Sequence, residues 1–147
     1  TPFPAIAVIG IGCRLPGEIK SPAAFWTLLK NNVDALGEFP PARRLLWPSH
    51  AGPPPQRGGF LSDVEQFDAD FFRISPREAA YIDPQQRLLL EVSWDALAHA
   101  GINHSTLAGS DTGVFVGMFA HDYERMQAVA GAPSVYFGTG TACATAS

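Results

Sequence analysis

The hydrophobic pattern along the chain is most regular between Pro84 and Ala100. Apolar residues recur there at three- and four-residue steps, which gives a helix one broad apolar face. The positions in this pattern are Leu89, Val92, Trp94, Ala96, Leu97 and Ala100. Asp83 is a suitable N-cap before Pro84, and Gly101 stands where a left-handed residue ends a helix, with Ile102 closing back on Leu97. We therefore predict a core helix on which the neighbouring segments pack.

Two short apolar runs predict β-strands. Residues 5–12, with the sequence AIAVIGIG, form a continuous run rich in Ile and Val, which is typical of a buried strand. Residues 113–119, with the sequence GVFVGMF, combine strand-forming Val and Phe with two glycines that favour close backbone approach. Because strands alternate with helices along the chain, the pattern predicts the α/β class.

Shorter elements are indicated by caps and turn residues. Ser21 followed by Pro22 predicts a helix to about Asn31, and Ser75 followed by Pro76 predicts a second short helix. Residues 32–56 hold six prolines and little periodicity, so we expect an irregular surface excursion. Three further expectations are a turn or a close backbone approach at residues 58–61, a helical turn at residues 67–72 that places aromatic side chains for burial, and a helix over residues 123–129.

Composition changes this picture in one respect. The chain has 147 residues, which suggests one domain. Apolar residues make up 46% and charged residues only 16%, below the quarter or so that is usual for a free-standing soluble domain. This balance suggests a surface that is covered by more polypeptide or by a second subunit.

Charge and cysteine content narrow the expected partners and compartment. The net charge of −4 and the absence of a basic run argue against a nucleic-acid partner. Cys13 and Cys143 form neither a disulfide framework nor a metal-binding pattern, which favours a reduced, cytoplasmic chain. The longest apolar run is too short to span a bilayer, and the start lacks the charged leader of a signal peptide.

The residues alone offer three candidates for chemistry, none of them complete. Gly10 and Gly12 follow a predicted strand as in dinucleotide-binding folds, but Leu15 stands where a third small residue is required, so a tight turn is favoured. Cys143 is a possible nucleophile, yet no histidine is near it in sequence, which favours a small buried residue. The histidines are not at metal-ligand spacing; they are His50, His99, His104 and His121.

Several ordered motifs resemble one known family. They are IAVIGIGCRLPG, SPAAFWTLL, RGGFLSDVEQFDADFFRISPREAAYIDPQQRLLLEVSWDALAHAGI, TGVFVG and YFGTG. The chain resembles the N-terminal part of the ketosynthase domain of modular polyketide synthases, among the thiolase-like condensing enzymes. The resemblance implies an α/β fold in which residues 1–147 are an N-terminal fragment of a single ketosynthase domain, itself an α-β-α-β-α sandwich.

The resemblance also implies an activity and partners. Such enzymes are homodimers that perform decarboxylative Claisen condensation. An active-site cysteine takes an acyl group from an acyl carrier protein, and two histidines promote reaction with a malonyl-type extender. No cofactor is expected beyond the phosphopantetheine that carries the substrates. Because Cys143 directly follows the Gly138-Thr139-Gly140 segment, we align it with an ordinary helix position and expect no catalytic residue in this chain.

Some substrate-binding residues do carry over by resemblance. Met118, Phe119 and Ala120 follow the TGVFVG strand and correspond to residues that line the substrate channel. Phe137 and Thr141 correspond to a segment that crosses the dimer axis and touches the partner's pocket. Plain core packing is the alternative role for all five residues.

Three functions therefore remain open at this point. The first is a part of a ketosynthase that completes its site with the remainder of the domain. The second is a non-catalytic dimerisation or docking module derived from a ketosynthase, which the low charge and many aromatics would suit. The third, a nucleotide-binding α/β domain, rests only on Gly10 and Gly12.

Overall fold

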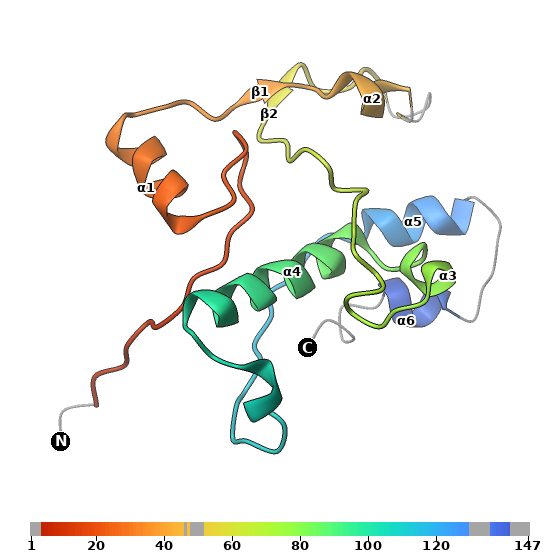
Figure 1. Ribbon diagram of the computed structural model, residues 1–147. Coiled ribbons are helices and arrows are strands. Elements are labelled where there is room, and N and C mark those ends of the chain that lie inside the picture. Colours follow the sequence, from red (N-terminus) through yellow and green to blue (C-terminus); the bar gives the residue numbers. More distant parts are fainter. Residues whose placement is uncertain (1–3, 46, 48–51, 130–135, 142–147) are drawn as a thin grey trace. The chain divides into compact units, whose positions relative to one another are not determined.

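The computed structural model describes residues 4–45, 47, 52–129 and 136–141. The chain divides into two compact units. The first comprises Thr1–Asp63 and Trp94–Ile102, and the second comprises Val64–Ser93 and Asn103–Ser147. Both units draw residues from one long helix, α4, which spans Pro84–His99. Figure 1 labels the elements along the chain.

The first unit holds two short helices and the two-stranded sheet. Helix α1 spans Pro22–Lys30, and helix α2 spans Pro41–Arg44. Strands β1, Gly37–Glu38, and β2, Arg57–Gly58, pair antiparallel. The predicted cap of α1 is confirmed, because the Ser21 hydroxyl oxygen accepts a hydrogen bond of 3.2 Å from the N–H of Ala24.

The second unit holds the remaining helices. Helix α3 spans Pro76–Ala79, α5 spans Asp122–Val129, α6 spans Phe137–Thr141, and a 3₁₀ turn, η2, spans His104–Thr106. Figure 1 shows α3, α5 and α6 near the N-terminal end of α4. The predicted cap of α3 is confirmed by a 3.2 Å hydrogen bond from the N–H of Glu78 to the Ser75 hydroxyl.

Helix α4 ends as the sequence predicts. Gly101 has φ of +68°, its N–H donates to the Ala98 carbonyl at 3.0 Å, and the N–H of Ile102 donates to the Leu97 carbonyl at 2.9 Å. This pair of bonds is the Schellman motif. Burial along α4 is lower than a core helix would have, because only Gln86 is fully buried among its residues. Trp94 and Leu90 remain about one-third exposed.

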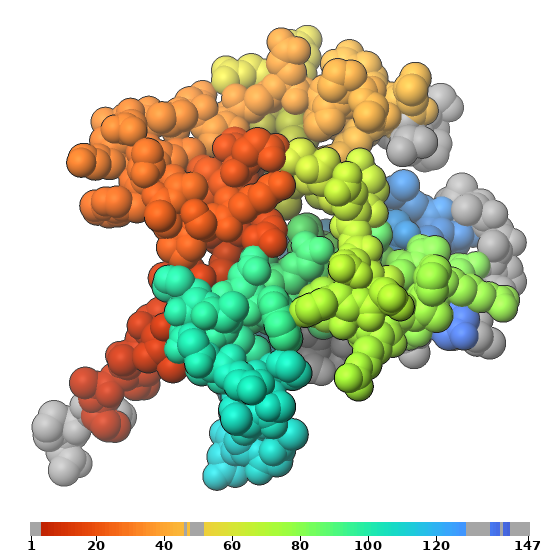
Figure 2. Space-filling view, in the orientation of Figure 1, coloured from red at the N-terminus to blue at the C-terminus, as the bar shows by residue number. Residues whose placement is uncertain are grey.

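Both strand predictions are wrong for the structure described. Residues 5–12 and 113–119 belong to no strand, and they leave large side chains open to solvent. Ile6 is 94% exposed and Phe115 is 96% exposed. A strand persists only where neighbouring strands pair with its N–H and C=O groups, and none does so within the described ranges. The space-filling view shows residues 4–9 as an uncovered segment (Figure 2).

The expected irregular excursion at residues 32–56 is also only partly right, because β1 and α2 lie inside it. Asp34 organises its start by accepting hydrogen bonds from the N–H of Leu36 at 2.9 Å and from the Arg57 guanidinium at 3.2 Å. These two donors, the Leu36 N–H first, hold the pKa of Asp34 below its ordinary value. The sequence could not reveal this pairing, since Arg57 joins the loop from 23 residues away.

Each unit has a small core of its own. In the first unit Phe39 is buried, with the Trp47 and Phe60 rings edge-on at centroid distances of 5.4 and 5.2 Å. In the second unit Ile82 is buried, and the half-buried rings of Phe67 and Phe72 stack at 5.3 Å in the turn that the sequence predicts. Within the described ranges, every helix falls short of the length and hydrophobicity that a membrane-spanning helix needs.

Candidate functional site

The turn that begins α4 is the best-organised polar site of the second unit. Asp83 is only 3% exposed, and its carboxylate accepts a 2.8 Å hydrogen bond from the N–H of Gln85. The Asp83 carbonyl accepts from the N–H groups of Gln86 and Arg87 at 2.9 and 3.2 Å. Pro84, the first residue of the helix, has no N–H group. Every backbone N–H from Pro84 to Arg87 therefore has an acceptor on Asp83. The predicted N-cap is therefore confirmed.

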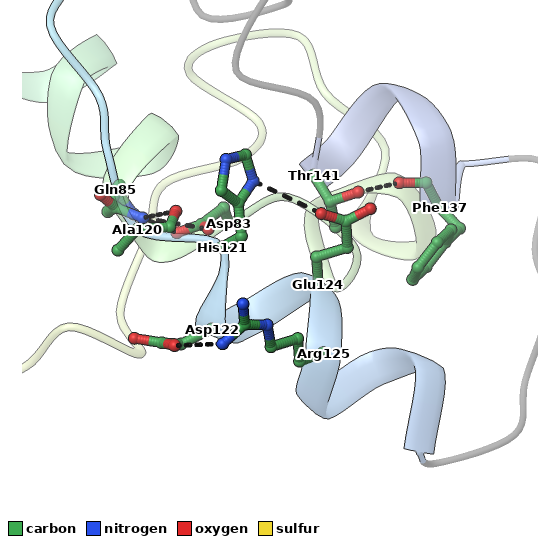
Figure 3. A network of polar contacts seen from close by, with 9 residues as sticks. All are labelled: Asp83, Gln85, Ala120, His121, Asp122, Glu124, Arg125, Phe137 and Thr141. Atoms are coloured by element: carbon green, nitrogen blue, oxygen red, sulfur yellow. Dashed lines mark hydrogen bonds and ion pairs between the residues drawn. The ribbon is translucent and has the colours of Figure 1, made fainter.

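Gln85 extends this turn to a distant part of the chain. Its side-chain amide donates to both carboxylate oxygens of Asp83, at 3.3 and 3.2 Å, and to the carbonyl of Ala120 at 3.1 Å (Figure 3). Both N–H groups of the amide are thereby used. Gln85 joins the helix start to the end of the segment that carries three of the expected substrate-binding residues.

That segment, residues 113–120, alternates in exposure from Phe115 onward, whereas Gly113 and Val114 before it are both exposed. Val116, Met118 and Ala120 are half-buried, whereas Phe115, Gly117 and Phe119 are exposed. A period of two is the signature of extended backbone, so successive side chains lie on opposite sides. The structure therefore separates the three expected residues: Met118 and Ala120 share the half-buried side, and Phe119, 95% exposed, lies on the other.

Helix α6 carries the other two expected residues. Thr141 is 4% exposed, and its hydroxyl donates to the Phe137 carbonyl at 2.7 Å, one turn earlier (Figure 3). Phe137 is half-buried. This bond within the helix satisfies the buried hydroxyl, so the burial of Thr141 leaves no side-chain polar group unpaired.

The backbone of α6 is held against the residues that precede α4. The N–H of Asp83 donates to the Gly140 carbonyl at 2.8 Å. Gly140 lies so close to Tyr81 that an added Cβ would overlap the Tyr81 carbonyl oxygen. The rings of Tyr81 and Tyr136 lie 6.4 Å apart. A glycine is therefore required here for close approach rather than for a special backbone angle.

Helix α5 reaches the same place. The Tyr123 hydroxyl donates to the Ala80 carbonyl at 2.7 Å, and the side-chain amide of Gln127 lies 3.3 Å from that oxygen. At the start of α5, His121 lies 3.4 Å from Glu124, and an exposed pair joins Arg125 to Asp122 at 4.0 Å (Figure 3). Exposed pairs of this kind add little stability. Residues 80–85 are thus the place where α5, α6 and Ala120 meet.

The described residues hold no complete set of groups for covalent chemistry. Cys143 lies outside them, and Cys13, the free thiol that the structure describes, is half-buried in the first unit. No cluster of three or more potential metal ligands occurs among the described side chains. The described residues bring Ala120, α5 and α6 together at one turn, and half-buried Met118 lies two residues before Ala120.

Gly10, one of the two glycines considered for dinucleotide binding, packs closely against α4. An added Cβ on Gly10 would overlap the Ala96 carbonyl oxygen and lie 2.9 Å from the Ala100 side chain. The next helix, α1, begins only at Pro22, so no helix N-terminus follows the glycines to bind a phosphate. The geometry favours close packing on α4 over dinucleotide binding.

Gln85 is the residue of this site that the sequence did not reveal. Its contact with Ala120 spans 35 positions, and no periodicity reports such a pair. The available signal was local: an Asp N-cap followed two positions later by a residue with a side-chain amide.

The family model and the curated relatives that match this chain all point to the same family. The family model described as "Beta-ketoacyl synthase, N-terminal domain" matches residues 4–147. Polyketide synthase GfsE from Streptomyces halstedii is 48% identical over 97% of this chain and 4% of its own length. Spectinabilin polyketide synthase system protein NorA′ from Streptomyces orinoci is 47% identical over 99% of this chain and 4% of its own length. The chain therefore spans only a small share of these relatives.

Solved structures agree with the sequence matches. The oxazolomycin ketosynthase domain OzmH KS7 from Streptomyces albus JA3453 superposes with a TM-score of 0.70 at 34% identity, covering 84% of this chain and 23% of that domain. The ketosynthase from module 6 of the bacillaene synthase of Bacillus subtilis 168 gives a TM-score of 0.71 at 33% identity, covering 82% and 21%. These matches confirm the predicted fold class, an α/β portion of a thiolase-like fold.

Proposed function

This chain belongs to the beta-ketoacyl synthase family, and we propose that it is the N-terminal part of one polyketide-synthase ketosynthase domain. In that domain the reaction is a decarboxylative Claisen condensation between an acyl-enzyme thioester and a malonyl-type extender on acyl carrier protein. The observation that carries the proposal is the family match over residues 4–147, supported by superposition on two ketosynthase domains.

The proposed partners follow from the coverage of the relatives. The chain spans 23% of one solved ketosynthase domain, so the remainder of such a domain is its first partner. Acyl carrier protein and a second copy of the domain are the further partners. No cofactor enters beyond the phosphopantetheine arm that carries the substrates. A cytoplasmic location belongs to the same proposal, because the two cysteines of the sequence do not form the pattern of a disulfide framework.

The proposed contribution of this chain is to the acyl pocket. Met118 and Ala120 offer apolar surface from one side of an extended segment, and Phe119 offers a large ring from the other. Phe137 and Thr141 contribute from α6, near the partner copy's pocket. A channel for an acyl chain needs apolar walls and no charge, and none of the five residues is charged. The nucleophile and both histidines are supplied from outside these residues.

An acyl-loading assay tests this assignment. The 147-residue chain is incubated with an acyl thioester, and the mass of the intact protein is measured. We expect no stable acyl adduct, because Cys143 has no local base and we assign the nucleophile to another part of the domain. The matched variants Cys13→Ala and Cys143→Ala report on background thiol exchange. Stable acylation of the chain alone that Cys143→Ala abolishes and Cys13→Ala preserves would refute the assignment.

A second candidate is a non-catalytic dimerisation or docking module. The large apolar side chains left exposed in both units favour it; examples are Trp26, Val114, Phe115 and Phe119. Size-exclusion chromatography with light scattering separates the two proposals. A stable dimer of the chain alone supports the module, and a monomer that gains order only with the remainder of a ketosynthase domain supports the condensing enzyme.

A further inference from the structure

The two segments assigned to the acyl pocket, residues 118–120 and α6, are both attached to residues 83–85. The N–H of Asp83 holds the Gly140 carbonyl of α6 at 2.8 Å, and the side chain of Gln85 holds the Ala120 carbonyl at 3.1 Å. The Asp83 carboxylate joins these two attachments, because it accepts from both the backbone and the side chain of Gln85. The first turn of α4 therefore sets where Ala120 and Gly140 stand relative to each other.

The attachment of Ala120 depends on the Gln85 side chain. Its amide reaches the end of residues 113–120 from another element, across 35 positions of the chain. No strand pairing holds this segment in the described ranges, and Phe119 is almost fully exposed. Tyr123 and Gln127 attach α5, which follows this segment, to the Ala80 carbonyl, and the length of the Gln85 side chain sets how far Ala120 itself lies from α4.

Asp83, the second acceptor of the Gln85 side chain, is held in place by several hydrogen bonds. Asp83 is 3% exposed and is held on both sides, by its own N–H on Gly140 and by its carboxylate on the helix start. The backbone N–H of Gln85 donates to one carboxylate oxygen of Asp83 and its side-chain amide donates to both, which restricts rotation of this buried group. Gln85 is thus locked between a fixed carboxylate and the Ala120 carbonyl.

We propose that Gln85 is a positioning residue that sets the acyl-chain preference of the pocket by fixing the Met118–Ala120 segment relative to α6. The inference rests on the proposed function, since it assigns a role within the same pocket. Gln85 touches no reacting atom in this scheme. It acts through the Ala120 carbonyl, and its removal lets the segment shift and changes the space available to the acyl chain.

The test uses a complete ketosynthase domain that contains this chain. The measured quantity is the ratio of kcat/KM for a long and a short acyl thioester. Gln85→Leu keeps the approximate volume and removes both donors. Gln85→Asn keeps the donors, shortens the reach by one methylene and serves as the second variant should the leucine variant fail to fold. Gln66→Leu is the matched control, because it makes the same replacement at an exposed glutamine of the same unit, outside both pocket segments.

We expect both Gln85 variants to change the ratio about fivefold or more, the size of effect that loss of one neutral hydrogen bond gives. Gln66→Leu should keep the wild-type ratio. A purely structural role would lower kcat/KM for both thioesters by the same factor and leave their ratio unchanged. An unchanged ratio in both Gln85 variants would therefore overturn the inference.

A third variant, Met118→Ala, distinguishes an incorrect positioning role for Gln85 from an incorrect assignment of the acyl pocket. A changed ratio in Met118→Ala with an unchanged ratio in the Gln85 variants refutes the positioning role alone. An unchanged ratio in all three variants refutes the assigned pocket and the positioning role together. A wild-type domain that forms no condensed product refutes the proposed function.

Discussion

Gly140 determines how closely α6 approaches the start of α4. Its carbonyl accepts from the N–H of Asp83, and its Cα faces the peptide between Tyr81 and Ile82. An added Cβ would lie 2.6 Å from the Tyr81 carbonyl carbon and 3.0 Å from the Ile82 nitrogen. Backbone atoms cannot rotate away as a flexible side chain can, so a larger residue must move the whole helix.

We therefore predict that Gly140→Ala destabilises the complete ketosynthase domain by about 1–3 kcal/mol, the usual cost of overpacking a close contact. Gly138→Ala is the matched control, because it lies in the same helix and its added Cβ would meet nothing within 4 Å. Urea unfolding of the two variants measures the difference. Equal stability of both variants would contradict the close packing of α6 on Tyr81.

Helix α4 shows what local sequence can specify in this chain. Its N-cap, its proline at the first position and its glycine ending are all encoded within a few residues of the ends that they define. The same holds for the serine caps of α1 and α3. These elements were predictable because each cap bonds to a backbone group only a few positions away.

The glycine ending of α4 gives a second prediction. Gly101 has φ of +68°, and a Cβ there would meet nothing within 4 Å, so any cost of substitution comes from the left-handed backbone alone. Gly101→Ala should lower the free energy of unfolding of the complete ketosynthase domain by about 1 kcal/mol. Gly101→Asn should cost less, because asparagine tolerates this conformation better. Denaturant unfolding that ranks asparagine below alanine would contradict the Schellman ending.

The strands were not predictable in the same way. Residues 5–12 and 113–119 have the composition of strands, yet the described ranges provide no partner that completes their hydrogen bonds. The two strands that do form, β1 and β2, have two residues each, and they pair Gly37 with Gly58 and Glu38 with Arg57. Strand formation depends on contacts between distant segments, which apolar runs alone do not encode.

In the candidate site, too, the sequence indicates some residues and leaves the contacts between distant segments unspecified. The family resemblance predicts Met118, Ala120, Phe137 and Thr141 as substrate-binding residues, and this role stays a prediction; the structure attaches their two segments to the start of α4. Gln85 was missed because its contact with Ala120 joins residues far apart in sequence. The resemblance groups Phe119 with Met118 and Ala120, whereas the alternation of the extended backbone places its side chain on the opposite side.

Across the whole molecule, low charge and exposed apolar side chains have one explanation. The chain has 16% charged residues, and it leaves Ile6 and Phe115 almost entirely open. Exposed apolar area of this kind marks surface that binds other polypeptide. The solved ketosynthase domains that it superposes on are much longer than the part matched, at 23% and 21% coverage. We infer that the remaining polypeptide of such a domain covers these side chains.

The most direct test of the central claim is photo-crosslinking in the complete ketosynthase domain. The enzyme is loaded with an acyl thioester whose chain carries a diazirine, irradiated, digested and analysed by mass spectrometry. Met118→Ala serves as the matched variant that shortens one wall of the pocket. The account predicts adducts on residues 118–120 and on Phe137 or Thr141, with a changed distribution in Met118→Ala. Adducts confined to peptides outside these two segments would contradict it.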